Sequence, residues 1–242
     1  METNLKIPTQ DGKMIYARLR GPISQTLVVF VHGLGGRMDQ HIFYNGARFL
    51  EKHHISSLRF NLYSWEKNAR NLSDCTIETH SNDLDTVISY LRKQGAKKIF
   101  VVGHSFGGPT ILLSKNKDFE GIILWDPSYA EPLSFKDAEY VDCLDMYKDK
   151  WEFEILFNKA MVEEEKTLKE KEEAAIQEIK VPIKIISAGD GLLIEGGKRY
   201  FELANEPKEY VLLKGAGHCF DEEGMEERLF KETLSWINSH NK

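Results

Sequence analysis

Residues 97–108 read KKIFVVGHSFGG, and this stretch decides the fold. Its first half is an apolar run with the length of a buried strand, and its second half places Ser105 between Gly103 and Gly107. The next segment, PTILLSKN, has the apolar spacing of a helix. A serine on a very tight strand-to-helix turn needs small neighbours, because side chains two positions on either side would collide. The stretch therefore predicts a strand, a sharp turn with an exposed hydroxyl, and a helix.

The same strand-like pattern recurs along the chain. Apolar runs lie at residues 26–33, 55–63, 120–128, 181–190 and 208–218, and helical patterns lie at residues 39–54, 81–95 and 222–241. Such alternation predicts an α/β fold with a mostly parallel sheet flanked by helices. The opening segment differs, because two alternating stretches flank Asp11 and Gly12, which predicts an N-terminal antiparallel hairpin. We expect a single domain over residues 1–242.

A stretch of about 50 residues after Ser128 interrupts the alternation without a strand-like run. Its second half is rich in Glu, Lys and Ala, which favour helices. We therefore expect a helical cap insertion at about residues 130–180. The charged run EEEKTLKEKEE within it is expected to be a solvated helix face rather than a partner-binding segment.

Composition narrows the class of protein. The formal net charge is −6, which gives no electrostatic attraction for nucleic acid, and no run reaches the roughly 18 apolar residues of a membrane helix. The cysteines, Cys75, Cys143 and Cys219, are three in number and widely spaced, so neither a disulfide framework nor a zinc pattern is indicated. We expect a cytoplasmic protein without metal, cofactor or membrane span. Its oligomeric state is not indicated.

Four short motifs occur in a fixed order along the chain. They are HGLGG (32–36), GHSFGG (103–108), GD (189–190) and GAGH (215–218), each after a predicted strand. With these motifs the chain resembles the α/β-hydrolase fold serine hydrolases, in particular the small carboxylesterases and monoacylglycerol-lipase-like members. The resemblance implies the α/β-hydrolase fold and nucleophilic catalysis by Ser105.

A serine nucleophile needs a base, and the base needs an acid that holds it in one tautomer. His218 follows the apolar run YVLLKGAG, so it leaves the carboxyl end of a strand, where catalytic groups gather in open α/β sheets. Asp190 leaves a neighbouring run at the position that the family uses, whereas Asp126, which also ends a run, is the alternative acid. The sequence thus predicts a triad of Ser105, Asp190 and His218.

The resemblance also implies an oxyanion hole formed by the backbone N–H groups of Leu34 and Phe106. Trp151 and Phe157, in an aromatic part of the insertion, are candidates for binding an acyl chain, although they would equally serve to bury the insertion on the core. The predicted activity is cleavage of carboxylic esters of small to medium acyl substrates through an acyl-enzyme. The alternatives are a thioesterase or C–C hydrolase with the same triad, or a member of the fold that only binds a ligand.

Overall fold

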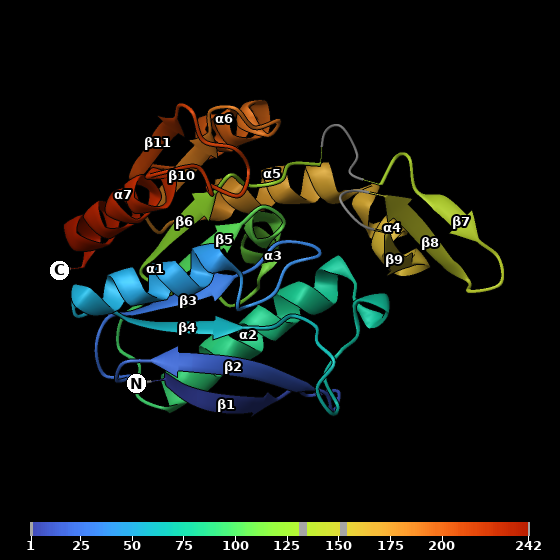
Figure 1. Cartoon of the computed structure of the whole chain (residues 1–242), viewed down its shortest axis with the longest axis horizontal. Helices are drawn as coiled ribbons and strands as arrows, with labels where there is room; N and C mark the ends of the chain where they lie inside the picture. Colours follow the sequence, from blue (N-terminus) through green and yellow to red (C-terminus); the bar gives the residue numbers. More distant parts are fainter. Residues whose placement is uncertain (1, 131–134, 151–153, 242) are drawn as a thin grey trace.

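The computed structural model describes residues 2–130, 135–150 and 154–241. An eight-stranded sheet with the order β1-β2-β4-β3-β5-β6-β10-β11 forms its centre (Figure 1). Its strands are β1 (Glu2–Pro8), β2 (Met14–Arg20), β3 (Leu27–Val31), β4 (Ser56–Phe60), β5 (Ile99–His104), β6 (Gly121–Trp125), β10 (Ile183–Ala188) and β11 (Lys208–Leu213). The strands from β4 to β11 are parallel, whereas β1 pairs antiparallel with β2 and β2 with β4. The predicted mostly parallel sheet and N-terminal hairpin are confirmed.

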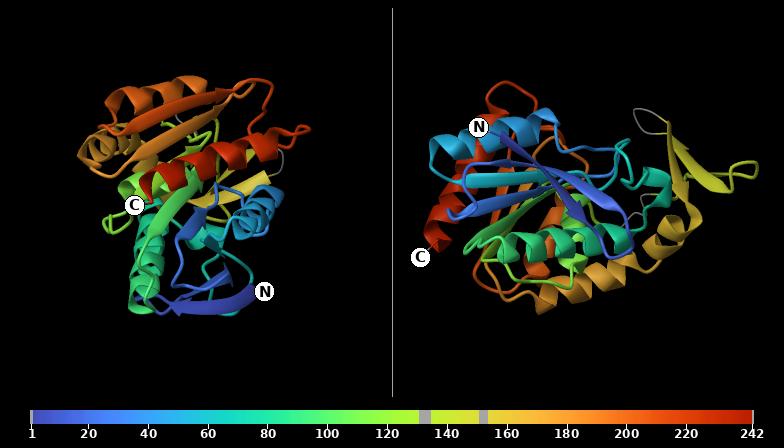
Figure 2. Two further views of the ribbon diagram at one scale, coloured as in Figure 1. Left: turned by 90° about the vertical axis from the view of Figure 1, so that its left-hand side faces the viewer. Right: turned by 90° about the horizontal axis from the view of Figure 1, so that it is seen from below.

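Helices cover both faces of this sheet (Figures 1 and 2). They are α1 (His41–Lys52), α2 (Ile77–Lys93), α3 (Gly107–Leu113), α5 (Leu168–Glu178), α6 (Ile194–Leu203) and α7 (Met225–His240), and a short 3₁₀ helix, η1, spans Leu72–Asp74. On one face α1 and α7 pack around Phe43 and Trp125, and on the other α2, α3, α5 and α6 enclose a second core. Every residue of β3, β5 and β6 is buried, which explains why these strands are continuous apolar runs.

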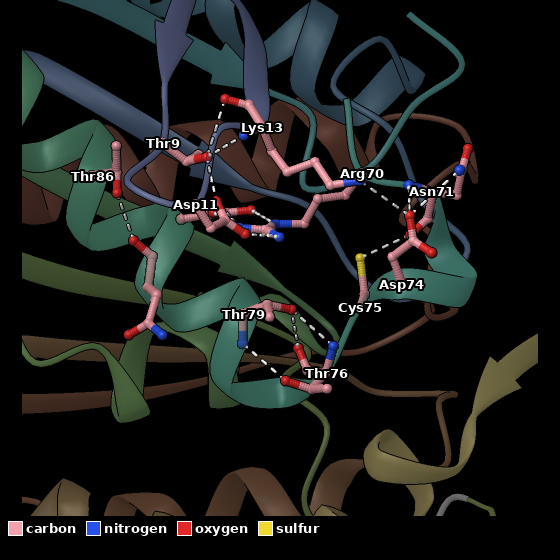
Figure 3. Close-up of polar contacts among 12 residues, drawn as sticks. Thr9, Asp11, Lys13, Arg70, Asn71, Asp74, Cys75, Thr76, Thr79 and Thr86 are labelled. Atoms are coloured by element: carbon pink, nitrogen blue, oxygen red, sulfur yellow. Dashed lines mark hydrogen bonds and ion pairs between the residues drawn. The ribbon is translucent and has the colours of Figure 1, made fainter. Parts of the chain in front are cut away.

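The N-terminal hairpin is tied to α2 by one arginine. The Arg70 guanidinium contacts the Asp11 carboxylate at 2.7 Å and the buried Asp83 carboxylate at 2.8 Å. Figure 3 shows the ion pair between Arg70 and Asp11. Below this pair it shows the reciprocal hydrogen bonds of Thr76 and Thr79, which cap the start of α2. The Arg70 hydrogen bond lowers the pKa of the Asp11 carboxyl to about 2, so this ion pair persists in mildly acidic solution.

The insertion differs in part from the helical segment that the sequence predicts. It contains α4 (Lys159–Glu165) and α5, as expected, but also an antiparallel sheet of β7 (Glu139–Val141), β8 (Met146–Lys150) and β9 (Glu154–Asn158). In β9 the buried Ile155 and Phe157 alternate with exposed neighbours, which is the period of a strand. An exposed leucine between them, Leu156, conceals that alternation in the sequence. In Figure 1 the three strands lie beside α4, at the end of the molecule farthest from α7.

Two glutamates of the insertion helices turn inward. Glu172 of α5 is fully buried, and its carboxylate accepts a hydrogen bond from the backbone N–H of Ala130 at 2.8 Å. Glu165 of α4 is also buried and accepts from the N–H of Phe135 at 3.0 Å. Burial raises the pKa of the Glu172 carboxyl to about 7, because hydrogen bonding to the Ala130 N–H and to Tyr200 offsets only part of the desolvation.

This burial predicts a pH-dependent stability. In the unfolded chain the Glu172 carboxyl titrates near its ordinary pKa of 4.5, whereas in the folded protein it keeps its proton up to about pH 7. The free energy of unfolding should therefore fall as pH rises from 4.5 to 7, by about 1–3 kcal/mol. Glu172→Gln removes the titration, so its melting temperature relative to wild type should rise between pH 5 and pH 8.

The neighbouring Glu173 provides the matched control. Its carboxylate pairs with Arg199 at 2.8 Å, and this hydrogen bond lowers its pKa. Glu173→Gln should therefore not gain stability relative to wild type as pH rises. A difference between Glu172→Gln and wild type that is the same at pH 5 and pH 8 would contradict the prediction.

Candidate active site

Ser105 lies on a strained turn between β5 and α3. Its φ is +55°, in the left-handed region that residues other than glycine rarely adopt. The turn is held by hydrogen bonds from the Ser105 N–H to the Trp125 carbonyl at 3.0 Å and from the Gly108 N–H to the Ser105 carbonyl at 2.9 Å. A Cβ on Gly103 would lie 2.6 Å from the Gly107 carbonyl, and one on Gly107 would collide with the backbone of β3. The expected reason for these two glycines is confirmed.

His218 and Asp126 form a direct pair beside this turn. Nδ1 of His218 lies 2.6 Å from Oδ2 of Asp126, and the other carboxylate oxygen accepts from the Ala188 N–H at 3.0 Å. Asp126 is fully buried at the end of β6, whereas the His218 side chain is 39% exposed. Since the carboxylate can only accept, Nδ1 of His218 carries the proton and Nε2 is left free to act as a base.

Here the structure differs from the sequence expectation, because the carboxylate on His218 belongs to Asp126 and not to Asp190. Asp190 follows β10 and its backbone N–H donates to the Ala216 carbonyl at 2.9 Å. Its side chain is exposed and makes no hydrogen bond or ion pair within the described residues. The physical reason is direction: β6 and β10 are neighbours and end at the same edge of the sheet, but Asp126 points inward under His218 while Asp190 faces solvent.

Two further histidines hold the loops of the site. Nε2 of the buried His104 donates to the backbone carbonyl of His218 at 2.8 Å, so it fixes the loop that carries His218. Burial lowers the pKa of the His104 imidazole to about 3. His32 donates from Nδ1 to the Gly33 carbonyl at 2.8 Å and accepts at Nε2 from the Leu62 N–H at 3.0 Å. His32 thus supports the HGLGG loop, and His104 supports the loop that carries His218.

The loop after β3 and the turn after β5 approach each other at Ser105. A Cβ on Gly33 would lie 2.9 Å from Cβ of Ser105, so the loop backbone passes close to the Ser105 side chain. The backbone N–H groups of Leu34 and Phe106 donate no hydrogen bond to any described residue. Unpaired N–H groups beside a nucleophile are what an oxyanion hole requires.

One residue of this site was not identified from the sequence. The hydroxyl of Ser128 lies 3.2 Å from the Ser105 hydroxyl, while Ser105 and His218 are not hydrogen-bonded to each other in the described part of the chain. The pair Asp126-Pro127 before Ser128 is typical of a turn, and a serine in a turn is not marked as a site residue by its sequence. The apolar runs 120–128 and 181–190 both contain an aspartate near their end, Asp126 and Asp190. This was the available signal that the segment around Ser128 lies at the site.

A family model matches residues 28–231 and carries the description alpha/beta hydrolase family. The chain belongs to the alpha/beta hydrolase family. Among solved structures, Est1E from Butyrivibrio proteoclasticus with bound ferulic acid superimposes with a TM-score of 0.82 at 17% identity, covering 98% of each chain. An esterase domain from Rhodothermus marinus gives 0.79 at 17% identity, covering 99% of each chain.

A monoacylglycerol lipase from Paleococcus ferrophilus gives a TM-score of 0.72 at 18% identity, covering 93% of this chain and 99% of the other. No match was found among the curated proteins. The structural neighbours show that this alpha/beta hydrolase shares its fold with esterases and a lipase. No helix among the described residues is long and apolar enough to cross a membrane.

The two residues expected to bind an acyl chain have different outcomes. Trp151 lies outside the described residues. Phe157 is fully buried in an apolar cluster with Phe135, whose ring centroid is 4.6 Å away, and this cluster reaches Phe106 and, at its edge, Leu34. A role of Phe157 in acyl binding stays a prediction, and it would require this cluster to open.

Proposed function

We propose that the protein is a serine hydrolase that cleaves carboxylic esters through an acyl-enzyme, with Ser105 as nucleophile, His218 as base and Asp126 as the orienting acid. The observation that carries the proposal is the 2.6 Å contact between the buried Asp126 carboxylate and Nδ1 of His218, next to a serine with φ of +55°. A buried carboxylate, an imidazole paired with it and a serine on a strained turn are the parts of acyl-transfer catalysis.

In the proposed mechanism Ser105 Oγ attacks the ester carbonyl while Nε2 of His218 takes its proton. Asp126 stabilises the imidazolium, and the free N–H groups of Leu34 and Phe106 donate to the oxyanion. His218 then protonates the leaving alcohol and later takes a proton from water to release the acid. The hydrogen of the Ser105 hydroxyl must point towards Nε2 of His218 before attack, while Oγ stays in contact with the Ser128 hydroxyl, and catalytic hydrogen bonds are often incomplete without substrate.

For the substrate we propose a chemical class and not a particular molecule. The neighbouring structures named as esterases and as a monoacylglycerol lipase favour an oxygen ester, and the apolar cluster next to Phe106 favours an apolar acyl group. Apolar pockets discriminate only weakly by chain length. We therefore expect activity over a range of small to medium acyl groups.

The proposal is tested by turnover of p-nitrophenyl esters with increasing acyl length, set beside thioesters of the same acids. We expect ester hydrolysis with a burst of product, because an acyl-enzyme accumulates when its hydrolysis is slow. A fluorophosphonate should label Ser105, as located by mass spectrometry of the labelled peptide. Faster turnover of thioesters would shift the assignment to a thioesterase, and binding without turnover or labelling would contradict a hydrolase.

A further inference from the structure

Ser128 is fixed in place by its backbone. Its N–H donates to the Ser105 carbonyl at 3.0 Å, and its own carbonyl accepts from the Tyr200 hydroxyl at 2.9 Å. Tyr200 is fully buried in α6, and Pro127, which precedes Ser128, is buried with a restricted φ. These contacts come from β5, α6 and the end of β6, so they hold the residue independently of its side chain.

The side chain of Ser128 is directed at the nucleophile. Its Oγ lies 3.2 Å from Ser105 Oγ, and both residues are only partly buried. In the free protein either hydroxyl serves as the donor. Ser128 thus contacts the atom that reacts, which neither His104 nor His32 does.

Removal of the Ser105 proton makes this hydrogen bond directional. Once His218 has taken that proton, Ser105 Oγ has no hydrogen to give, and Ser128 is left as the donor. A hydrogen bond to a charged oxygen is stronger than one between two neutral hydroxyls. The contact is therefore stronger when charge develops than in the resting protein, and interactions of this kind accelerate a reaction.

We propose that Ser128 is a catalytic residue whose hydroxyl donates a hydrogen bond to Ser105 Oγ while that oxygen carries negative charge. This occurs as Ser105 attacks and again as the bond from the acyl carbon to Ser105 Oγ breaks. Ser128 keeps its own proton throughout: His218 passes the Ser105 proton to the leaving alcohol, and later returns a proton from water to Ser105. The inference rests on the proposed function, because it assumes acyl transfer by Ser105.

The test compares Ser128→Ala, Ser128→Thr and wild type. We expect Ser128→Ala to lower both kcat and the rate of fluorophosphonate labelling of Ser105 about 10- to 100-fold, which is the contribution of a hydrogen bond to a charged oxygen. KM should change little, and Ser128→Thr, which keeps a hydroxyl, should recover much of the loss. Ser239→Ala, on the exposed side of α7, is the control for loss of a serine hydroxyl elsewhere.

The outcomes separate this inference from the proposed function. Labelling and turnover of Ser128→Ala within about twofold of wild type, or faster than wild type, would overturn the role of Ser128 while ester hydrolysis stands. Labelling that slows in Ser128→Ala, in a protein that hydrolyses no ester, would support Ser128 and reject the ester substrate. Wild-type protein that is not labelled at Ser105 would overturn both. Melting temperatures near wild type are expected, because the Ser128 anchors are backbone atoms.

Discussion

Ser105→Ala is expected to lower ester turnover by about 10³- to 10⁶-fold, because no other described group on the strained turn supplies a nucleophile. The residual rate should come from the oxyanion donors at Leu34 and Phe106 and from substrate binding, which do not depend on the Ser105 hydroxyl. The measurement is kcat on the best p-nitrophenyl ester, together with fluorophosphonate labelling, which should be lost.

The folded state should survive this substitution. Among the described residues, the one hydrogen bond of the Ser105 side chain goes to Ser128. The turn is held instead by backbone hydrogen bonds of Ser105 and Gly108 and by the close approach of Gly103 and Gly107. A melting temperature close to wild type would show that lost activity is a loss of chemistry. Turnover close to wild type in this variant would reject Ser105 as the nucleophile.

The sequence predicts Ser105 and His218 because each is marked by its local surroundings. The glycines at positions 103 and 107 are required by direct backbone contacts of the turn. The GHSFGG motif therefore predicts the backbone geometry of the turn. His218 follows β11 and is brought back to the turn by its loop, whose backbone His104 holds. Local sequence is therefore sufficient to predict where both residues lie, and their catalytic roles stay predictions.

The sequence does not show in the same way which aspartate contacts His218. Asp126 and Asp190 each follow a parallel strand, and β6 and β10 are hydrogen-bonded neighbours, so both carboxylates are expected at one edge of the sheet. What separates them is the direction of the side chain. Asp126 has a φ of +40°, which turns its carboxylate beneath His218 and against the Ala188 N–H. That backbone angle depends on tertiary packing and is not marked by any residue type.

The sequence predicts the helices of the insertion but not its strands, for a related reason. Helix propensity is sufficient for residues 159–178, where charged residues and alanine dominate. The strands β8 and β9 depend on pairing with each other and on burial of Ile155 and Phe157 against the apolar cluster around Phe106. Such contacts override local propensity, and they are invisible along a single segment.

Asp126→Asn is expected to lower kcat by about 10⁴-fold, whereas Asp190→Asn should leave it within about twofold of wild type. The reason is the tautomer of His218. An asparagine at position 126 would keep its amide oxygen on the Ala188 N–H, where Oδ1 accepts at 3.0 Å, and would present its NH₂ group to Nδ1 of His218. The imidazole would then carry its proton on Nε2, where it cannot take the proton of Ser105.

The pair of variants also decides between the two aspartates without a bound substrate. Both substitutions remove one negative charge at the same edge of the sheet, so a general electrostatic effect would weaken labelling of Ser105 in both proteins alike. Only the geometric argument predicts that Asp126→Asn slows fluorophosphonate labelling while Asp190→Asn does not. The opposite pattern would mean that the loop carrying His218 moves to Asp190 during catalysis. The 2.6 Å contact between Asp126 and His218 would then belong to the resting protein and not to the reacting one.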